Sequence, residues 1–326
     1  MIRVRIGTLG AARITPSALI KPAKLVPGVE VAAVAARDRS RAEAFAAKHG
    51  IPVVHESYEV LIGDPSIDAV YNPLPNARHA EWTLRALEAG KHVLCEKPLA
   101  SNEPEARSVA EAAEKHGLVV MEAFHYRYHP LADRMVSIVG ELGEIKQIET
   151  WLCFPLPRFS DIRYSLPLSG GALMDAGCYA VHLARLLGGG EPTVRAARAL
   201  LRSPGVDRAM SASLEFPSGA AGRVNASLWS SQLLRISARV VGSRGQMRVF
   251  NFIAPQAFHR LSYTVDGVTK RERVAGDATY TYQLRAFVSA VETGEGNLTP
   301  PSDSIANMAV IDEIYRKAGL APRGTI

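Results

Sequence analysis

The sequence contains little cysteine and has no long hydrophobic run. Only three cysteines, Cys95, Cys153 and Cys178, occur among 326 residues. Their odd number and wide spacing argue against a disulfide framework and against a zinc cluster with paired ligands. The N-terminus lacks the apolar stretch of a signal peptide, and no window approaches membrane-spanning length. We therefore expect a reducing, cytoplasmic setting, with no membrane partner and no bound metal.

Dense basic runs with interleaved aromatic residues are also missing, although the formal net charge is +6. No zinc-finger, homeodomain or RNP pattern occurs, so we expect no nucleic-acid partner. A modest positive charge equally suits an enzyme that attracts phosphorylated cofactors. Low-complexity segments and internal repeats are absent, and 47% of the residues are hydrophobic. The chain should therefore be folded throughout, and its length predicts two domains.

Short apolar runs alternate with helical patterns in the first part of the chain. Strands are expected at Ile2–Leu9, Val29–Ala35, Ala69–Asn72, Val93–Cys95 and Val119–Glu122, with helices at Ser17–Leu25, Arg39–His49, Ala77–Ala89 and Glu103–His116. This alternation predicts an α/β fold with a doubly wound parallel sheet, because parallel neighbours need right-handed crossovers that are usually helices. Residues 1–124 should form a Rossmann domain that binds ligands outside the carboxyl ends of its strands.

The pattern changes after about Arg127. Helices are expected at Leu131–Val139 and Ala172–Leu187, and from Val194 the chain becomes a series of strands joined by hairpin turns such as Asp266-Gly267. The end returns to helix, at Tyr282–Glu292 and Ser302–Ala318. Residues 125–326 are therefore predicted to form an α+β domain with an antiparallel sheet.

A turn of small residues follows the first strand. Gly10, Ala11, Ala12, Arg13 and Ile14 lead into the first helix, where a dinucleotide pyrophosphate would meet backbone amides and a helix N-terminus. The G-x-G-x-x-G pattern is incomplete, because Ala12 takes the second glycine position and Thr15 the third. Ala12 still lets the backbone approach a phosphate. The alternative is an ordinary tight strand-to-helix turn.

The second strand ends in Ala36-Arg37-Asp38, where an NAD site normally holds an acidic residue on the ribose hydroxyls. An arginine at this strand tip can stack on adenine and pair with a 2′-phosphate, with Arg41 or Ser40 helping. NADP is therefore favoured as cofactor. Asp38 keeps NAD open, and a solvated turn of mixed charge is the third possibility.

Two further strand ends carry candidate groups. The next strand leads into a proline-stiffened loop, and the one after it ends in Cys95-Glu96-Lys97-Pro98. Lys97 should point at the cleft where a nicotinamide would lie, and its ammonium can bind a substrate oxygen. The candidate cofactor contacts from these segments are Pro73, Leu74, Asn76, His79, Glu96, Lys97 and Pro98.

A glycine pair precedes a helix with polar residues on one side. Asp175, Tyr179 and His182 are spaced by four and three, so they share a helix face and could form a proton-transfer group with Lys97. A solvated polar face is the alternative. Further candidates for substrate contacts are His125, Arg127, Tyr128, Arg163 and Tyr164, although Arg127 could instead form a buried structural pair.

Together these features resemble the Gfo/Idh/MocA oxidoreductase family. The matching elements are Gly7-x-x-Gly10-x-Ala12, Pro73-Leu74-Pro75-Asn76 with His79, Glu96-Lys97-Pro98, Glu122-Ala123-Phe124, Gly170-Gly171-Ala172-Leu173-x-Asp175-x-Gly177, and Leu298-Thr299-Pro300 with Asn307. The resemblance covers nearly the whole chain. It implies a Rossmann domain followed by an α+β domain whose open, mainly antiparallel sheet serves homodimers or homotetramers.

The resemblance also implies that Lys97 and Asp175 are catalytic. Many members carry histidine four places after the aspartate, whereas this chain has Tyr179, as in the branch of dihydrodiol dehydrogenases, some xylose dehydrogenases and glucose-fructose oxidoreductase. Tyr179 then becomes the proton donor or acceptor, and His182 is either a substrate contact or a packing residue.

The resulting hypothesis is an NADP(H)- or NAD(H)-dependent oxidoreductase acting on the CH–OH or C=O group of a sugar, polyol or cyclic diol. Tyr179, with its phenol acidified by Lys97, would exchange a proton with the substrate oxygen while the nicotinamide exchanges hydride with the carbon. Asp175 would orient the substrate hydroxyls. The alternatives are a keto-sugar reductase, including one acting on nucleotide sugars, and a non-catalytic dinucleotide-sensing protein.

Overall fold

The computed structural model describes residues 4–324 and divides into two compact units. The first contains the chain up to Ala100, together with Pro104–Tyr128 and Ala278–Ser304, and the second contains Ser101–Glu103, His129–Asp277 and the chain from Ile305 onward. The expected start of the first strand at Ile2 lies outside the described residues. The functional division at residues 124 and 125 stays a prediction.

Six parallel strands form the sheet of the first unit, in the order β3-β2-β1-β4-β5-β6. They are β1 (Val4–Leu9), β2 (Val29–Ala35), β3 (Val53–His55), β4 (Ala69–Asn72), β5 (His92–Cys95) and β6 (Val120–Glu122). These runs are mostly buried, as expected for parallel strands with helices on both faces. The predicted doubly wound α/β sheet is confirmed, and its strand order is that of a dinucleotide-binding fold.

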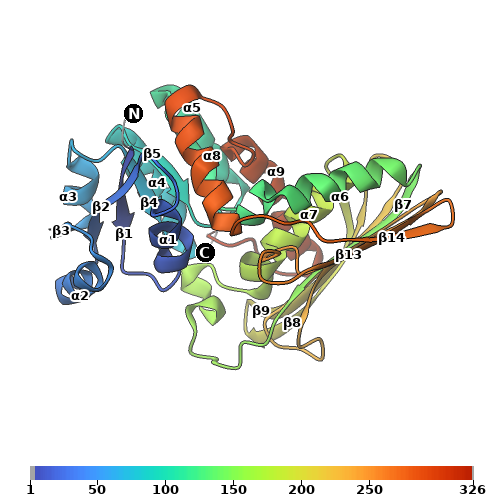
Figure 1. Cartoon of the computed structure of the whole chain (residues 1–326). Coiled ribbons are helices and arrows are strands. Elements are labelled where there is room, and N and C mark those ends of the chain that lie inside the picture. The colour runs from blue at the N-terminus through green and yellow to red at the C-terminus, as the bar shows by residue number, and fades with distance from the viewer. Residues whose placement is uncertain (1–3, 325–326) are drawn as a thin grey trace. The chain divides into compact units, whose positions relative to one another are not determined.

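The helices of this unit follow the expected alternation. They are the π-helical turn η1 (Pro16–Ile20) with α1 (Lys21–Ala23), α2 (Arg39–His49), α3 (Tyr58–Gly63), the turn η2 (Asn76–Arg78), α4 (His79–Glu88), α5 (Glu103–His116) and the turn η3 (His125–Tyr128). One further helix, α8 (Thr279–Thr293), comes from far along the chain (Figure 1). Its residues Leu284 and Phe287 join Ile6 and Leu94 of the sheet in one hydrophobic core. The first unit therefore depends on a late segment.

Eight strands form the sheet of the second unit, in the order β14-β13-β12-β11-β7-β10-β9-β8. They are β7 (Ile145–Cys153), β8 (Thr193–Ser203), β9 (Val206–Glu215), β10 (Ala221–Ser227), β11 (Arg235–Gly242), β12 (Gly245–Phe250), β13 (Arg260–Val265) and β14 (Val268–Glu272). The neighbouring strands pair antiparallel except β10 with β7, which is parallel. The predicted α+β unit with a mainly antiparallel sheet is confirmed.

Helices cover one face of this second sheet. They include α6 (Pro130–Glu141) and α7 (Cys178–Gly188), which follows the π-helical turn η6 (Leu173–Gly177), while α9 (Pro301–Lys317) lies near the end of the chain. Thr150 of β7 donates to the Ala180 carbonyl of α7 at 2.8 Å. Because side chains alternate along a strand, Glu149 and Trp151 lie on the opposite face. No helix of the described chain is long and apolar enough to cross a membrane.

Candidate active site

The turn after β1 is suited to a dinucleotide phosphate. Gly10 has a φ of +88°, which favours glycine, and its N–H donates to the Ala35 carbonyl of β2 at 2.6 Å. A Cβ at Gly10 would lie 3.5 Å from Leu74 Cδ2 and 3.6 Å from the Tyr58 hydroxyl. Ala11 and Ala12 are partly exposed, and Arg13 and Ile14 are exposed ahead of η1. Small side chains at a helix N-terminus fit a pyrophosphate.

The residues after β2 form a positively charged surface. Arg37, Asp38 and Arg41 are exposed. Asp38 Oδ1 accepts from the Ser40 hydroxyl at 2.7 Å and from the Arg41 N–H at 3.2 Å, and these hydrogen bonds lower the pKa of Asp38. The Asp38 carboxylate therefore caps α2, as an N-cap residue does. The guanidinium groups of Arg37 and Arg41 are suited to bind a ribose 2′-phosphate.

Tyr58 of α3 belongs to the same surface. Burial raises the pKa of its phenol, and the neighbouring Arg37, Arg41 and Arg78 oppose that shift. The Tyr58 ring packs edge-on against Trp82 of α4, with 4.8 Å between the ring centroids. The phenol thus lies in the field of three guanidinium groups. Neither β3 nor α3 was predicted, because a three-residue strand is too short to show a period, and Tyr58 was missed with them.

His79 connects two of the predicted loops. Its Nε2 lies 2.6 Å from the Leu74 carbonyl, and its Nδ1 lies 2.7 Å from the Pro98 carbonyl. Burial lowers the pKa of His79 to about 4, and the two carbonyls oppose the shift. His79 was predicted as a cofactor contact. The geometry shows a buried ring that ties the loop after β4, which contains Pro73 and Asn76, to the segment after β5.

Lys97 follows β5 at the carboxyl edge of the first sheet. The preceding Glu96 accepts a 2.7 Å hydrogen bond from the Tyr71 hydroxyl, whose pKa burial raises. His125 pairs through Nδ1 with the Thr279 hydroxyl at 2.7 Å, and its ring stacks on Tyr280 with 4.0 Å between the ring centroids.

The charge of Lys97 acts on two buried imidazoles near this edge. Burial, followed by the charge of Lys97, lowers the pKa of His125 to about 3. Lys97 also contributes to the lowered pKa of His79. Both imidazoles are therefore neutral near pH 7. An ammonium at this edge can stabilise an oxygen that gains negative charge.

In the second unit, Asp175 forms an ion pair with Arg163. Asp175 Oδ2 lies 2.9 Å from Arg163 Nε, and Arg163 Nη1 lies 3.1 Å from Asp161. Asp175 raises the pKa of Arg163. These two predicted site residues are thus brought together. The neighbouring Tyr164 is buried, and its hydroxyl donates to the Leu156 carbonyl at 2.9 Å.

Tyr179 and His182 lie one turn apart on α7, with exposed fractions of 6% and 4%. The side chain of Asp175, in η6, is 12% exposed. The alternative of a solvated polar face is therefore wrong. Because η6 is a π-helical turn, the spacing from Asp175 to Tyr179 is not that of a regular α-helix.

Side chains hold the backbone on both sides of Tyr179. Asn307 of α9 donates to the Cys178 carbonyl at 3.2 Å, and Thr150 donates to the Ala180 carbonyl. Asn307 also accepts from Arg185 at 3.4 Å. A π-helical turn frees carbonyls from the regular helical pattern, so such partners fix the start of α7.

Comparisons with known proteins decide the family. A model of the oxidoreductase family with an NAD-binding Rossmann fold matches residues 4–124, and a model of the GFO/IDH/MocA C-terminal domain matches residues 134–248. The chain belongs to the Gfo/Idh/MocA oxidoreductase family. It is a dehydrogenase or reductase with a nicotinamide-binding Rossmann fold, as the resemblance predicted.

Three relatives within this family show the range of substrates. A D-xylose 1-dehydrogenase (NADP(+)) of Haloferax volcanii is 40% identical over 96% of both chains. A dTDP-3,4-didehydro-2,6-dideoxy-α-D-glucose 3-reductase of Streptomyces violaceoruber is 36% identical over 90% of this chain and 87% of its own. The solved 3-ketoreductase of Actinomadura kijaniata, in complex with NADP and TDP-benzene, has a TM-score of 0.89, 28% identity, and coverage of 97% and 98% of the two chains.

Family features outside the site have structural roles. Glu122, at the end of β6, accepts from the Leu99 N–H at 3.0 Å and from the Ser304 hydroxyl. Thr299 donates to the Glu122 carbonyl at 2.7 Å, and its hydroxyl pairs with Tyr128 at the same distance. The Glu122 and Thr299 motifs therefore meet, and they fix the segment after Lys97.

Sequence reasoning missed several residues that contact candidate site residues, among them Tyr58, Tyr71, Thr279 and Tyr280. Thr279 comes 154 residues after its partner His125, so no local spacing connects them. The available signal was the polar aromatic run Thr279-Tyr280-Thr281-Tyr282 ahead of an apolar helix.

Proposed function

We propose that this oxidoreductase transfers hydride between NADP(H) and the CH–OH or C=O carbon of a sugar, polyol or cyclic diol. The observation that carries the proposal is that Lys97 directly follows β5 at the carboxyl edge of the Rossmann sheet, where its charge contributes to the lowered pKa of His79 and of His125. A sugar hydroxyl carries no charge, so a fixed cation is useful mainly when negative charge develops on its oxygen.

The cofactor would be held by three segments. Gly10, Ala11, Ala12, Arg13 and Ile14 would bind the pyrophosphate, Ala36, Arg37 and Arg41 the adenosine end with its 2′-phosphate, and Pro73, Leu74, Asn76, Glu96, Lys97 and Pro98 the nicotinamide end. Asp38 would support this surface by capping α2. The NADP specificity of the Haloferax relative supports the phosphorylated cofactor. When bound, the nicotinamide supplies the hydride acceptor or donor.

The chain's own side chains would move the proton. In the oxidative direction the phenolate form of Tyr179 would accept the proton of the substrate hydroxyl, and the substrate carbon would lose hydride to the oxidised nicotinamide. Lys97 would stabilise the oxygen during this step. The Asp175–Arg163 pair would orient neighbouring hydroxyls, and the remaining substrate contacts would be His125, Arg127, Tyr164 and His182. In the reductive direction the same atoms act in reverse.

The purified protein would be assayed for formation of reduced nicotinamide with NADP and NAD against D-xylose, other aldoses, polyols and trans-dihydrodiols. We expect turnover with NADP and at least one aldose or diol. Absence of turnover with every pair in both directions would refute the proposal.

A keto-sugar reductase is the second candidate. It is supported by the TM-score of 0.89 to the Actinomadura 3-ketoreductase. A nucleotide-linked 3-keto sugar with NADPH separates the two. If the keto sugar is reduced and free sugars are not oxidised, the reductase is the function.

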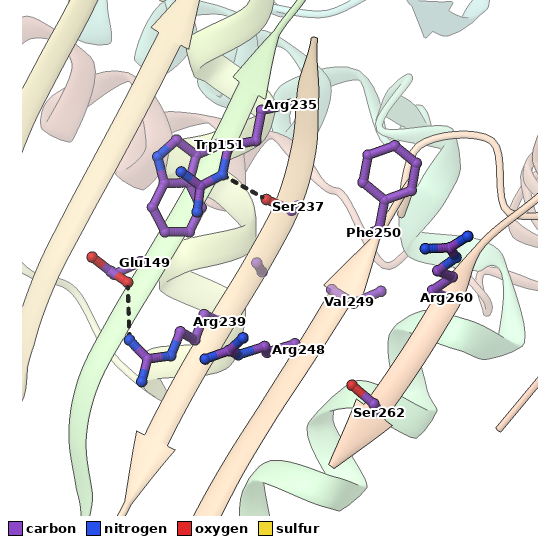
Figure 2. Close-up of a pocket in the computed structure, with 11 residues that line it drawn as sticks. Glu149, Trp151, Arg235, Ser237, Arg239, Arg248, Val249, Phe250, Arg260 and Ser262 are labelled. Carbon is purple, nitrogen blue, oxygen red and sulfur yellow. Dashed lines mark hydrogen bonds and ion pairs between the residues drawn. The ribbon is translucent and has the colours of Figure 1, made fainter. Parts of the chain in front are cut away.

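We also propose a homodimer or homotetramer assembled through the outer face of the eight-stranded sheet. On this face, Figure 2 shows Trp151 and Phe250 together with four arginines. The lining residues surround a groove of about 400 Å³ and include Glu149, Arg235, Arg239, Arg248 and Arg260. Arginine and tryptophan are typical of interface centres. Leu233 and Leu234, just before β11, are exposed beside it.

Charge gives this association a testable salt dependence. Arg239 lies opposite Arg248 in the register of β11 and β12, and among the described residues Glu149 is the one carboxylate that lines the groove. Two such faces repel each other, so added salt should strengthen association. Sedimentation velocity of Leu234→Asp should show monomer, whereas Leu25→Asp, at an equal 63% exposure, should assemble normally. A wild-type monomer at every salt concentration would contradict the proposal.

The compartment is also a proposal. We infer a cytoplasmic location, because Cys95, Cys153 and Cys178 are buried and form no disulfide within the described residues. Cell fractionation that finds the protein outside the cytoplasm would overturn it.

A further inference from the structure

A fully buried ion pair lies at the start of the segment that carries Asp175. Arg323 Nη2 donates to Asp207 Oδ1 at 2.7 Å, and the two side chains are 2% and 0% exposed. Asp207 belongs to β9, whereas Arg323 lies after α9, close to the end of the described chain. Burying such a pair costs solvation energy, and apolar residues of similar volume often give equal stability. Its presence therefore suggests a role in fixing geometry.

The two partners form hydrogen bonds with the loop before η6 and with the first residue of η6. Asp207 Oδ2 accepts from the Leu173 N–H at 2.7 Å, and its other oxygen accepts from the Tyr315 hydroxyl at 3.0 Å. Arg323 Nε donates to the Gly170 carbonyl at 2.7 Å, and its guanidinium carbon lies 4.1 Å from the centroid of the Tyr315 ring. Residues 170 and 173 are thus held by one guanidinium–carboxylate pair.

Gly171 lies at the centre of this arrangement. Its φ is +134°, and a Cβ there would lie 2.1 Å from Asp207 Oδ1 and 2.8 Å from Arg323 Nη2. The Gly171 N–H donates to the Arg163 carbonyl at 2.8 Å, and the Gly171 carbonyl accepts from the Asp175 N–H at 3.1 Å. The glycine pair therefore links the buried ion pair to both members of the Asp175–Arg163 pair.

We propose that Arg323 is a positioning residue for the reaction, acting through Asp207 and Gly170–Gly171 on Asp175 and on Tyr179 at the start of α7. The roles of Asp175 and Tyr179 rest on the proposed function. Without the guanidinium, the Gly170 carbonyl and the Asp207 carboxylate lose their shared partner, and the 170–179 segment gains freedom. A shift of about 1 Å in a reacting group can lower turnover by about 100-fold.

The experiment compares Arg323→Ala and Arg323→Lys with wild type and with Arg316→Ala. Arg316 is an exposed arginine of α9 that pairs with Glu313 at 3.4 Å, so its variant is a matched control for loss of charge near the C-terminus. Two readouts are collected on the full-length protein. Hydrogen–deuterium exchange follows the amides of residues 169–182, with β12, which is not paired with β9, as internal reference. Steady-state kinetics gives kcat, KM and the affinity for NADP.

We expect faster exchange in residues 169–182 of Arg323→Ala, with unchanged exchange in β12. The kcat should fall by about 10- to 100-fold, with NADP affinity within about 3-fold of wild type. Arg323→Lys keeps the charge but cannot donate to both partners with the same geometry, so its exchange rates and its kcat should lie between those of Arg323→Ala and wild type. Added guanidinium, at about 1 to 50 mM, should raise the kcat of Arg323→Ala on the order of several-fold. Arg316→Ala should match wild type in both readouts.

Unchanged local exchange in both Arg323 variants would overturn the proposal, whether or not a substrate is known. Equal loss of protection throughout the second unit would also overturn it, because that result identifies a general stability role. If Arg323→Ala does not fold, exchange and kinetics are measured on Arg323→Lys instead. Absence of wild-type turnover contradicts the proposed function alone, since the exchange result is independent of it.

Discussion

Lys97 and Tyr179 are the residues to which the proposed proton chemistry is assigned. Replacing Lys97 with Met removes the ammonium and keeps the chain length, and Tyr179→Phe removes the hydroxyl and keeps the ring. Each change should lower kcat by about 100- to 10,000-fold, which is the usual contribution of a positioned proton-transfer group. The affinity for NADP, measured by fluorescence titration, should change by less than about 5-fold for Tyr179→Phe.

Lys48→Met, on the exposed side of α2, is the control for loss of one lysine. Turnover close to wild type in both Lys97→Met and Tyr179→Phe would remove the basis for the assignment.

Arg37 and Arg41 are the residues to which we assign the proposed preference for the phosphorylated cofactor. The double change Arg37→Ala with Arg41→Ala should raise the KM for NADP by about 10- to 100-fold, because charge-assisted bonds to a phosphate are lost. The KM for NAD should change far less. Arg39→Ala, in the same segment and paired with Glu43 at 2.8 Å, is the matched control. An equal rise in the KM for NADP and for NAD would show that these arginines do not bind the 2′-phosphate.

Two glycines, at the ends of the segment from residue 171 to residue 189, show how backbone conformation and crowding act separately. Gly171 and Gly189 both have positive φ, but a Cβ at Gly189 meets no atom within 4 Å. Gly189→Ala should therefore cost only the strain of its conformation, about 1 kcal/mol. Gly171→Ala also meets the Asp207 carboxylate and should cost about 3 kcal/mol or more. Urea denaturation measures both, and equal losses would contradict the crowding argument.

Regular elements with clear periods were predicted well from the sequence. The bounds of β2, α2, β4 and α5 coincide with those expected, because each has a distinct apolar period or a recognisable end such as Gly50. The missed elements β3 and α3 are too short to show a period. The π-helical turns η1 and η6 replace the starts of two expected helices, since hydrophobic spacing does not distinguish π from α geometry over five residues.

Candidate site residues were predictable where a motif places them at a strand end or on one helix. Their supporting contacts were not, because they join distant parts of the chain, as the Thr279–His125 and Arg323–Asp207 pairs do. The incomplete glycine pattern at Gly10 shows the same limit, since its role depends on Leu74 and Tyr58 nearby in space.

For the molecule as a whole, two buried histidines make stability depend on pH. The pKa of His79 is lowered to about 4 and that of His125 to about 3, from 6.5 in both cases. Below about pH 6.5 the unfolded chain binds protons that the folded chain does not. Stability should therefore be full above that pH and fall as the pH decreases towards 4, by up to about 1.4 kcal/mol per pH unit for each histidine.

Urea denaturation at pH 7, 6 and 5 measures this dependence. His125→Gln should reduce the slope by the contribution of one proton, and an unchanged slope in this variant would contradict the assignment of a neutral buried ring to position 125.

Isotope labelling tests whether the protein transfers hydride from its substrate to NADP. The substrate found in the cofactor and sugar assay, for instance D-xylose, would carry deuterium on the carbon whose hydroxyl is oxidised, and mass spectrometry would follow the NADPH formed. We expect one deuterium in each NADPH formed by the wild-type protein, and a greatly reduced yield of NADPH from Tyr179→Phe. NADPH that forms without deuterium, or equal yields from the two proteins, would contradict it.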